Sequence, residues 1–266
     1  MEQGADIKQK ILDANIKLHR IEAPCYDALH PEEFNWFEQG RLRRDMARIA
    51  SFLPANSSAL DIGCGTGNIL LKLLALRLDV TGVDISEDMV KSLRLRIPPG
   101  MESRAKLSVQ NADDFLINCA RKYDLITASS VLHHVPDYIS TLRMAISRIS
   151  PGGWLYIVHE PTKDSLGADP FLRKILWQLD SLAYDILRAR SVPRTEARDY
   201  RMSDYHLYHG FDEEKVLEEC RRMDLEVISF TRYSSTMRMG LSCWIDSFIL
   251  GSRRHFSLIA RRRQVK

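Results

Sequence analysis

The sequence predicts an α/β protein built on a doubly wound, mainly parallel sheet. Short apolar runs alternate with helical segments through the middle of the chain, as in repeated strand–helix units. A glycine-rich turn follows the first of these runs, where such a sheet places its ligand-binding crevice. The expected strands cover residues 59–62, 80–83, 105–109, 124–128 and 154–158, and strand signals return at 225–233 and 256–260.

The composition excludes several other classes. The chain has 266 residues, of which 45% are hydrophobic and 27% are charged, so it is too apolar for a disordered chain. Its length suits one large domain with an insertion. The formal net charge of +3 is too small to indicate a nucleic-acid partner, and we expect none.

The cysteines and the first residues indicate a cellular setting. The five cysteines are scattered without a C-x-x-C pair, and the N-terminal residues show no apolar signal-peptide segment. No apolar run is long enough to cross a membrane. We therefore expect a cytoplasmic protein with reduced thiols and no membrane span. The sequence does not indicate an oligomeric state.

The helical segments divide the chain into four parts. An N-terminal helical cap, a core, a helical lid between strands five and six, and closing strands are expected at residues 1–53, 54–161, 162–222 and 223–266. Apolar spacing in the cap predicts helices at about 7–18 and 32–52.

Within the lid, residues 171–187 predict an amphipathic helix. Its apolar side comprises Leu172, Ile175, Leu176, Leu179, Leu182 and Ile186. We expect this side to form the core of the lid rather than a membrane helix.

The most specific motif is the turn after the first expected strand, which contains Asp61, Gly63, Cys64, Gly65 and Gly67. Glycines at these positions allow a tight turn and a close approach of the backbone to a ligand. The G-x-G-x-G spacing differs from the G-x-G-x-x-G of dinucleotide enzymes. A plain tight turn is the alternative interpretation.

Acidic residues follow the next two expected strands. Asp84 ends the second strand, where a carboxylate can accept hydrogen bonds from both hydroxyls of a ribose or can cap the helix that begins at Ser86. Asp113 and Asp114 follow the third strand, where one carboxylate can accept an adenine amine or cap the next helix. Ser129, Ser130, His133 and His134 follow the fourth strand, and a Pro-Gly-Gly turn precedes the fifth.

In this order and spacing, these motifs resemble those of class I S-adenosylmethionine-dependent methyltransferases. The similarity is to the small-molecule branch that includes enzymes of ubiquinone and menaquinone biosynthesis, and it covers about residues 35–160. The resemblance implies a Rossmann-like, seven-stranded sheet whose last strand is antiparallel. It also implies S-adenosylmethionine as the cofactor and S-adenosylhomocysteine as its product.

The resemblance assigns roles to individual residues. Asp61 would meet the cofactor's amino group, Asp84 would hold the ribose, and Asp113 would take the adenine amine. The remaining expected contacts with the methionine moiety, ribose and adenine are Gly63, Cys64, Gly65, Gly67, Ile85, Ala112, Asp114, Ser129 and Ser130.

Methyl transfer from a sulfonium needs alignment and a dry site, with a base only where the acceptor carries a weakly acidic proton. His134 and, second, His133 are candidate bases, while loop packing is the alternative role for each. Candidate substrate contacts are Tyr26, His159, Tyr205 and His206. No Cys/His spacing resembles a structural zinc pattern, so we expect no metal.

These features lead to one expected function and two alternatives. The expected function is S-adenosylmethionine-dependent methyl transfer to a small-molecule acceptor by in-line displacement. An RNA or protein methyltransferase is the first alternative, although no Asn/Asp-Pro-Pro-aromatic motif follows the fourth strand. The second alternative is a cofactor-binding regulatory protein without turnover.

Overall fold

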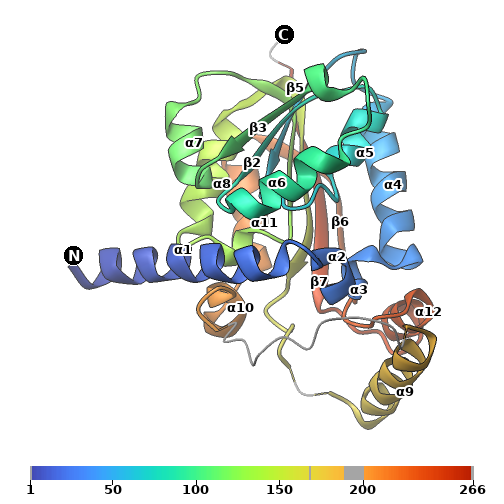
Figure 1. Ribbon diagram of the computed structural model, residues 1–266. Coiled ribbons are helices and arrows are strands. Elements are labelled where there is room, and N and C mark those ends of the chain that lie inside the picture. Colours follow the sequence, from blue (N-terminus) through green and yellow to red (C-terminus); the bar gives the residue numbers. More distant parts are fainter. Residues whose placement is uncertain (1, 168, 189–200, 265–266) are drawn as a thin grey trace.

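The computed structural model describes residues 2–167, 169–188 and 201–264, and its centre is a seven-stranded sheet between two layers of helices (Figure 1). The strands lie in the order β3-β2-β1-β4-β5-β7-β6. Strands β1 to β5 pair in parallel, and β7 runs antiparallel to both β5 and β6. The strands are β1 (Ser58–Ile62), β2 (Asp79–Asp84), β3 (Ala105–Val109), β4 (Tyr123–Ser129), β5 (Ile149–Pro161), β6 (Leu225–Tyr233) and β7 (His255–Arg262). The predicted fold class and all seven predicted strands are therefore confirmed.

The helices that pack on the sheet cover both of its faces, and other segments of the chain lie across one end. On one face, α4, α5 and α6 bury Met46, Leu73 and Leu93 against the strands. On the other face, α7, α8 and α11 bury Leu116, Leu142 and Val216. The longer helices are α1 (Glu2–Glu22), α4 (Trp36–Ala50), α5 (Leu70–Ala75), α6 (Glu87–Arg96), α7 (Ala112–Asn118), α8 (Tyr138–Ser147), α9 (Phe171–Arg188) and α11 (Glu213–Arg222). The shorter ones are α2 (Tyr26–Leu29), α3 (Pro31–Phe34), η1 (Glu102–Arg104), η2 (Leu132–His134), α10 (Tyr205–His209), α12 (Gly240–Trp244) and the π-helical η3 (Ile245–Ile249).

The single helix predicted at 32–52 is wrong, because the chain breaks at Asn35. The backbone of Asn35 is extended, and its side chain accepts a hydrogen bond from the Glu38 amide at 3.1 Å. Asparagine favours this capping conformation over continuing a helix. The break separates α3 from α4, and the short helices α2 and α3 bring Tyr26 and Glu33 to the carboxyl ends of the strands.

The segment predicted to form a lid, residues 162–222, covers the end of the sheet only in part. Helix α9 lies beside α12 at the edge of the molecule, while α1 crosses the carboxyl ends of the parallel strands (Figure 1). The apolar side of α9 that was expected to form a lid core is mostly exposed, so this prediction is wrong. Residues 189–200 of the expected lid lie outside the described residues. Within the described ranges, no helix is both long and apolar enough to cross a membrane.

Candidate functional site

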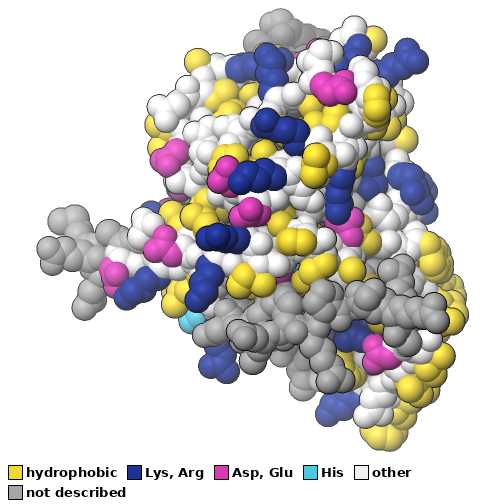
Figure 2. Space-filling view, in the orientation of Figure 1, with side chains coloured by type: hydrophobic (Ala, Val, Ile, Leu, Met, Phe, Trp, Pro, Cys, Tyr) yellow, Lys and Arg dark blue, Asp and Glu magenta, His cyan; other side chains and the backbone are white. Residues whose placement is uncertain are grey.

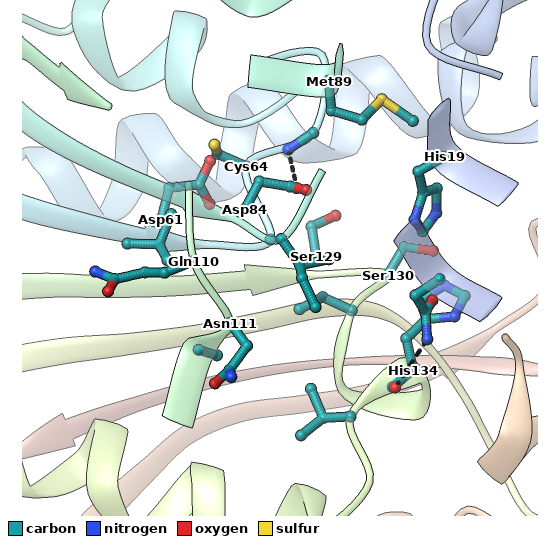
Figure 3. A pocket seen from close by; sticks show the side chains of 18 of the residues that line it. His19, Asp61, Cys64, Asp84, Met89, Gln110, Asn111, Ser129, Ser130 and His134 are labelled. Carbon is teal, nitrogen blue, oxygen red and sulfur yellow. Dashed lines mark hydrogen bonds between the residues drawn. The ribbon is translucent and has the colours of Figure 1, made fainter. Parts of the chain in front are cut away.

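A cavity of about 220 Å³ lies where β1, β2 and β4 end, beneath α1. We call it the main cavity; Figure 3 shows Asp61, Cys64 and Asp84 on one side of it and His19 and His134 on the other. Thirteen of the predicted site residues line it: Tyr26, Asp61, Gly63, Cys64, Gly65, Asp84, Ile85, Ala112, Asp113, Asp114, Ser129, Ser130 and His134. The chain therefore brings together at one site motifs that are far apart in the sequence.

A second cavity of about 280 Å³ adjoins the main cavity. Both are lined by His19, Tyr26, Glu33, Ser130 and His134, so these side chains lie at the junction. The second cavity continues along His133, His159 and Asp204. A ligand in one cavity can therefore meet a ligand in the other beside His134.

The glycine loop passes too close to its neighbours for other side chains. Gly63 has a φ of +67°, and a Cβ there would lie 2.3 Å from Val131 Cγ2. Gly67 has a φ of +100°, and its Cβ would lie 2.4 Å from Leu93 Cδ1. Gly67 packs against Leu93 of α6 and does not line the main cavity, so its expected contact with the cofactor stays a prediction. Both positions require glycine for steric reasons.

Asp84 connects the glycine loop to the end of β2. Its Oδ2 accepts from the Gly65 amide and its Oδ1 from the Ser86 amide, both at 2.8 Å. The helix cap itself is Ser86, whose side chain accepts from the Met89 amide. Burial raises the pKa of Asp84, and the two amide hydrogen bonds partly offset that effect. Each carboxylate oxygen retains a second lone pair for a ligand hydroxyl.

One carboxylate oxygen of Asp61 has no hydrogen-bond partner among the described residues. Its Oδ1 accepts from Thr127 Oγ1 at 2.7 Å, whereas its buried Oδ2 has no hydrogen-bond partner among the described residues. Burial raises the pKa of Asp61 to about 7, and the nearby Asp84 charge adds to the increase. A cationic ligand group at Oδ2 would supply the missing partner.

Asp113 and Asp114 do not cap the following helix themselves. Asn111 is the N-cap of α7, and its side chain accepts from the Asp114 amide at 2.9 Å. Asp113 instead accepts a short hydrogen bond from Thr141 Oγ1 of α8. Asp113 still borders the main cavity, but one of its oxygens is already occupied.

The two adjacent histidines have different surroundings. His133 Nδ1 lies 2.8 Å from Glu160 Oε2, and Glu160 also accepts from the amides of Val131, Leu132 and His133. Burial opposes the charge of His133, but the attraction of Glu160 outweighs it and raises the pKa of the imidazole. His133 lines only the second cavity, so it holds the loop together rather than facing the main cavity.

His134 faces both cavities. Its Nδ1 lies 2.8 Å from the Ser203 carbonyl and 3.2 Å from Asp204 Oδ1, so Nδ1 carries the proton in the neutral ring. Burial and then the neighbouring His133 lower the pKa of His134 to about 4. Burial similarly lowers the pKa of His19 to about 3, and the His19 ring meets His134 edge-on with centroids 5.5 Å apart. Near neutral pH, His134 therefore has an unprotonated Nε2.

The remaining predicted substrate residues divide into two groups. Tyr26 lines both cavities, and its hydroxyl donates to Glu33 Oε1 at 3.4 Å. His159 lines the second cavity, with Nδ1 3.3 Å from Glu38 Oε1. Tyr205 and His206 line neither cavity, so the structure does not bring these two predicted residues to the candidate site. Tyr205 stacks on His209, and His206 Nε2 donates to the Pro136 carbonyl.

The expected absence of a metal stays a prediction. His133, His134 and Asp204 offer possible ligand atoms that lie within 4.8 Å of one another. However, Nδ1 of each histidine already has a hydrogen-bond partner, and Asp204 is the partner of His134. Sequence spacing did not indicate this group because Asp204 lies on the inserted segment.

Sequence reasoning missed four residues that line one or both cavities: Asn15, His19, Glu33 and Asp204. Asn15 Nδ2 donates to the Ile11 carbonyl of its own helix at 2.9 Å, and to the carbonyls of His134 and Ser203 at 3.3 Å. A buried asparagine on the apolar side of a predicted helix was the available signal for this residue.

Comparisons with known proteins agree with this architecture. Residues 34–229 match a family described as "Methyltransferase domain". Because the match covers most of the chain, the chain belongs to this family. This membership confirms the predicted resemblance to class I methyltransferases.

Particular relatives are similar over parts of the chain. A ubiquinone biosynthesis O-methyltransferase from Bordetella avium is 34% identical over 131 residues, which are 48% of this chain and 49% of that protein. The chain thus spans about half the length of the curated relatives it matches.

The plantazolicin methyltransferase BpumL, solved with S-adenosylhomocysteine, has a TM-score of 0.58 at 16% identity and 98% coverage of both chains. The N-methyltransferase NodS from Bradyrhizobium japonicum, also solved with S-adenosylhomocysteine, has a TM-score of 0.53 at 16% identity, with 86% of this chain and 88% of that chain covered. These structures support the fold.

Proposed function

We propose that the chain binds S-adenosylmethionine in the main cavity and transfers its methyl group to a hydroxyl of a small molecule in the second cavity. The observation that carries this proposal is the position of Asp61 and Asp84 opposite a neutral His134. Family membership supports the reaction class, and the O-methyltransferase relatives support an oxygen acceptor.

The residues of the main cavity fit the proposed cofactor. The unpartnered Oδ2 of Asp61 suits an ammonium group, and the free lone pairs of Asp84 suit the two ribose hydroxyls. Ile85 and Met89 add apolar lining near Asp84. Asp113 is the weakest of the expected contacts because Thr141 already occupies one of its oxygens.

The cofactor supplies a methyl group that is already activated on sulfur. The protein then has to align the acceptor oxygen with that group and exclude water, and alignment can contribute up to ~7–11 kcal/mol. Helix α1 closes the main cavity with Leu12, Asn15 and His19, which limits access of water.

His134 is the proposed general base. Its protonated Nδ1 is held by the Ser203 carbonyl and Asp204, so Nε2 is the atom that can accept the acceptor's proton. Asp204 lies 3.2 Å from Nδ1 and stabilises the positive ring that forms. His133 is a positioning residue, because its Nδ1 is held by Glu160 and its ring does not line the main cavity.

Two measurements test this proposal. S-adenosylmethionine should raise the Tm of the protein, because a ligand that binds only the native state stabilises it. Incubation with methyl-labelled cofactor should then label a small-molecule fraction of the source cells rather than RNA or protein. Labelled RNA or protein would favour the first alternative, and binding without any transfer would favour a regulatory protein. No Tm shift at saturating cofactor would contradict the proposal at its first step.

A further inference from the structure

Helix α9 is oriented with polar residues inward and apolar residues outward. Arg173, Asp180 and Tyr184 are 4%, 2% and 8% exposed. The apolar residues predicted to be covered are open instead, for example Leu179 at 58% and Leu182 at 59%. This is the reverse of the usual arrangement of a surface helix.

Specific polar contacts fix this orientation. Arg173 Nε donates to both oxygens of the fully buried Asp246, at 3.0 and 3.1 Å. The Asp180 carboxylate accepts from the amides of Arg238 and Met239, at 2.8 and 2.9 Å. Turning α9 to hide its apolar side would break these contacts and leave buried charges unpaired, which is strongly unfavourable. These polar contacts of the folded chain therefore hold the apolar side of α9 at the surface.

Neighbouring segments extend this surface. Trp36 at the start of α4 is 62% exposed, and Phe248 of η3 is 66% exposed. Figure 2 shows hydrophobic side chains gathered along the edge where α9 and α12 lie in Figure 1. We call this surface the apolar edge; its residues are Trp36, Phe171, Leu172, Ile175, Trp177, Leu179, Leu182, Ile186, Leu187, Leu241, Trp244, Phe248 and Ile249. It holds more than half of the exposed large hydrophobic side chains among the described residues. Such a concentration marks an interaction surface rather than scattered surface residues.

The chemistry of the apolar edge favours a lipid surface over another protein surface. Four of its side chains are tryptophan or phenylalanine on α9, α12 and η3, the types that settle at the boundary of a bilayer. Lys174 and Arg253 lie on or beside these segments, while the exposed acid of α9, Asp185, is paired with Arg238 at 3.1 Å. In a two-fold dimer both copies use the same surface, so a second copy would bring more of the same basic side chains rather than an acidic counterpart to Lys174 and Arg253.

We propose that the apolar edge docks the protein on an anionic phospholipid bilayer surface, with α9 lying in the plane of the interface. The buried side of α9 reaches the second cavity, because Arg173 donates to Thr236 and Thr236 lines that cavity. Docking therefore holds the proposed acceptor site beside the bilayer, where apolar molecules concentrate. The docking itself does not depend on the proposed methyl transfer.

Vesicle flotation tests this proposal without cofactor or acceptor. The protein should float with vesicles of phosphatidylcholine and phosphatidylglycerol, more weakly with phosphatidylcholine alone, and less at high salt. Each of Leu179→Asp and Leu182→Asp should lower the partition coefficient about tenfold or more, because a buried leucine contributes roughly 1.5–3 kcal/mol. The control is Leu95→Asp, which changes an even more exposed leucine (89%) on α6, away from the apolar edge, and should float like the unaltered protein.

The folded state of each variant is checked by its Tm and by cofactor binding, both of which should be unchanged. Absence of flotation of the unaltered protein, or equal flotation of the Leu179 and Leu182 variants, overturns the proposal. A dimer that these variants dissociate, without any vesicle binding, also overturns it and identifies a second copy as the occupant.

Discussion

The two sides of the site are built in different ways. On the cofactor side, Asp61 and Asp84 stand at the ends of neighbouring strands, and Asp84 is held by amides of its own motif. On the acceptor side, His134 is held by Asn15 from α1 and by Ser203 and Asp204 from the insertion. The first side is built from two consecutive strands and the loops that follow them, and the second is assembled from three distant segments. Substitutions on the first side should change affinity or stability, and substitutions on the second should change turnover.

The largest effect is expected for His134→Ala. Loss of a general base should lower kcat about 10²- to 10³-fold while cofactor affinity stays nearly unchanged. Because the pKa of His134 is lowered from 6.5 to about 4, the ring is already unprotonated at neutral pH. The pH profile of kcat, measured at saturating cofactor and acceptor, should therefore show no loss near pH 6.5 and should fall only as the pH approaches about 4. A fall centred near 6.5 would contradict the assignment.

Asp84→Ala should mainly weaken cofactor binding. Removing the carboxylate deletes the proposed ribose contacts and the acceptor of the Gly65 amide, so Kd should rise roughly 10- to 100-fold. Calorimetric titration with S-adenosylhomocysteine measures this change directly. Asp84→Asn keeps one oxygen acceptor and should lose less affinity; equal affinity of all three proteins would refute the ribose assignment.

Gly63→Ala should destabilise the cofactor side of the site. Both the φ of +67° and the 2.3 Å approach to Val131 Cγ2 oppose a Cβ. The chain offers a matched control in Gly100, which has a φ of +83° but no heavy atom within 4 Å of a Cβ. Gly100→Ala should cost about 1–2 kcal/mol of unfolding free energy from backbone strain, and Gly63→Ala roughly 1–3 kcal/mol more. Urea denaturation of the two variants tests whether the difference exists.

The pH should change cofactor affinity through Asp61. Its folded pKa is raised to about 7, so the carboxylate is increasingly protonated below that pH and loses its attraction for an ammonium group. The affinity should therefore fall as the pH falls through about 7, approaching tenfold per pH unit below it. Asp61→Asn should remove this dependence while keeping a side chain of the same size, and a pH-independent Kd in the unaltered protein would exclude the pairing.

The smallest effect is expected for Asn15→Ala. Its amide joins α1 to the carbonyls of His134 and Ser203 through two long hydrogen bonds of 3.3 Å each. Their loss should lower kcat only a few-fold, about 0.5–1.5 kcal/mol per bond at most, and leave cofactor affinity unchanged. Turnover assays with isotope-labelled cofactor measure kcat, and parallel binding titrations measure the affinity for the cofactor.

Sequence reasoning located the cofactor side because its signals are local. The runs at 59–62 and 80–83 are short and mostly apolar; the first contains Asp61 and is followed by Gly63, and the second is followed directly by Asp84. The order and spacing of Asp61, Gly63 and Asp84 therefore predicted both the sheet and the crevice, and the fold is confirmed.

The acceptor side and α9 were predicted less well for a physical reason. Helical periodicity identifies an apolar side but not what covers it, so the spacing of Leu179 and Leu182 could not reveal their exposure. The ion pair of Arg173 with Asp246 joins residues far apart in the chain, and this contact sets the orientation of α9. Asn35 could have been read as a cap, but the apolar stripe across it favoured one continuous helix.

Asp27 links the N-terminal helical segment to the glycine loop and to α6, which affects how fast a ligand can leave the main cavity. Its Oδ1 accepts from Thr66 Oγ1 of the glycine loop at 2.8 Å, and its Oδ2 binds Arg96 of α6 at 2.7 Å. The segment that follows α1 is thereby fastened to the loop that would hold the cofactor. A ligand beneath α1 can leave more easily once this fastening opens, so we expect the Asp27 contacts to lengthen the residence time of the spent cofactor.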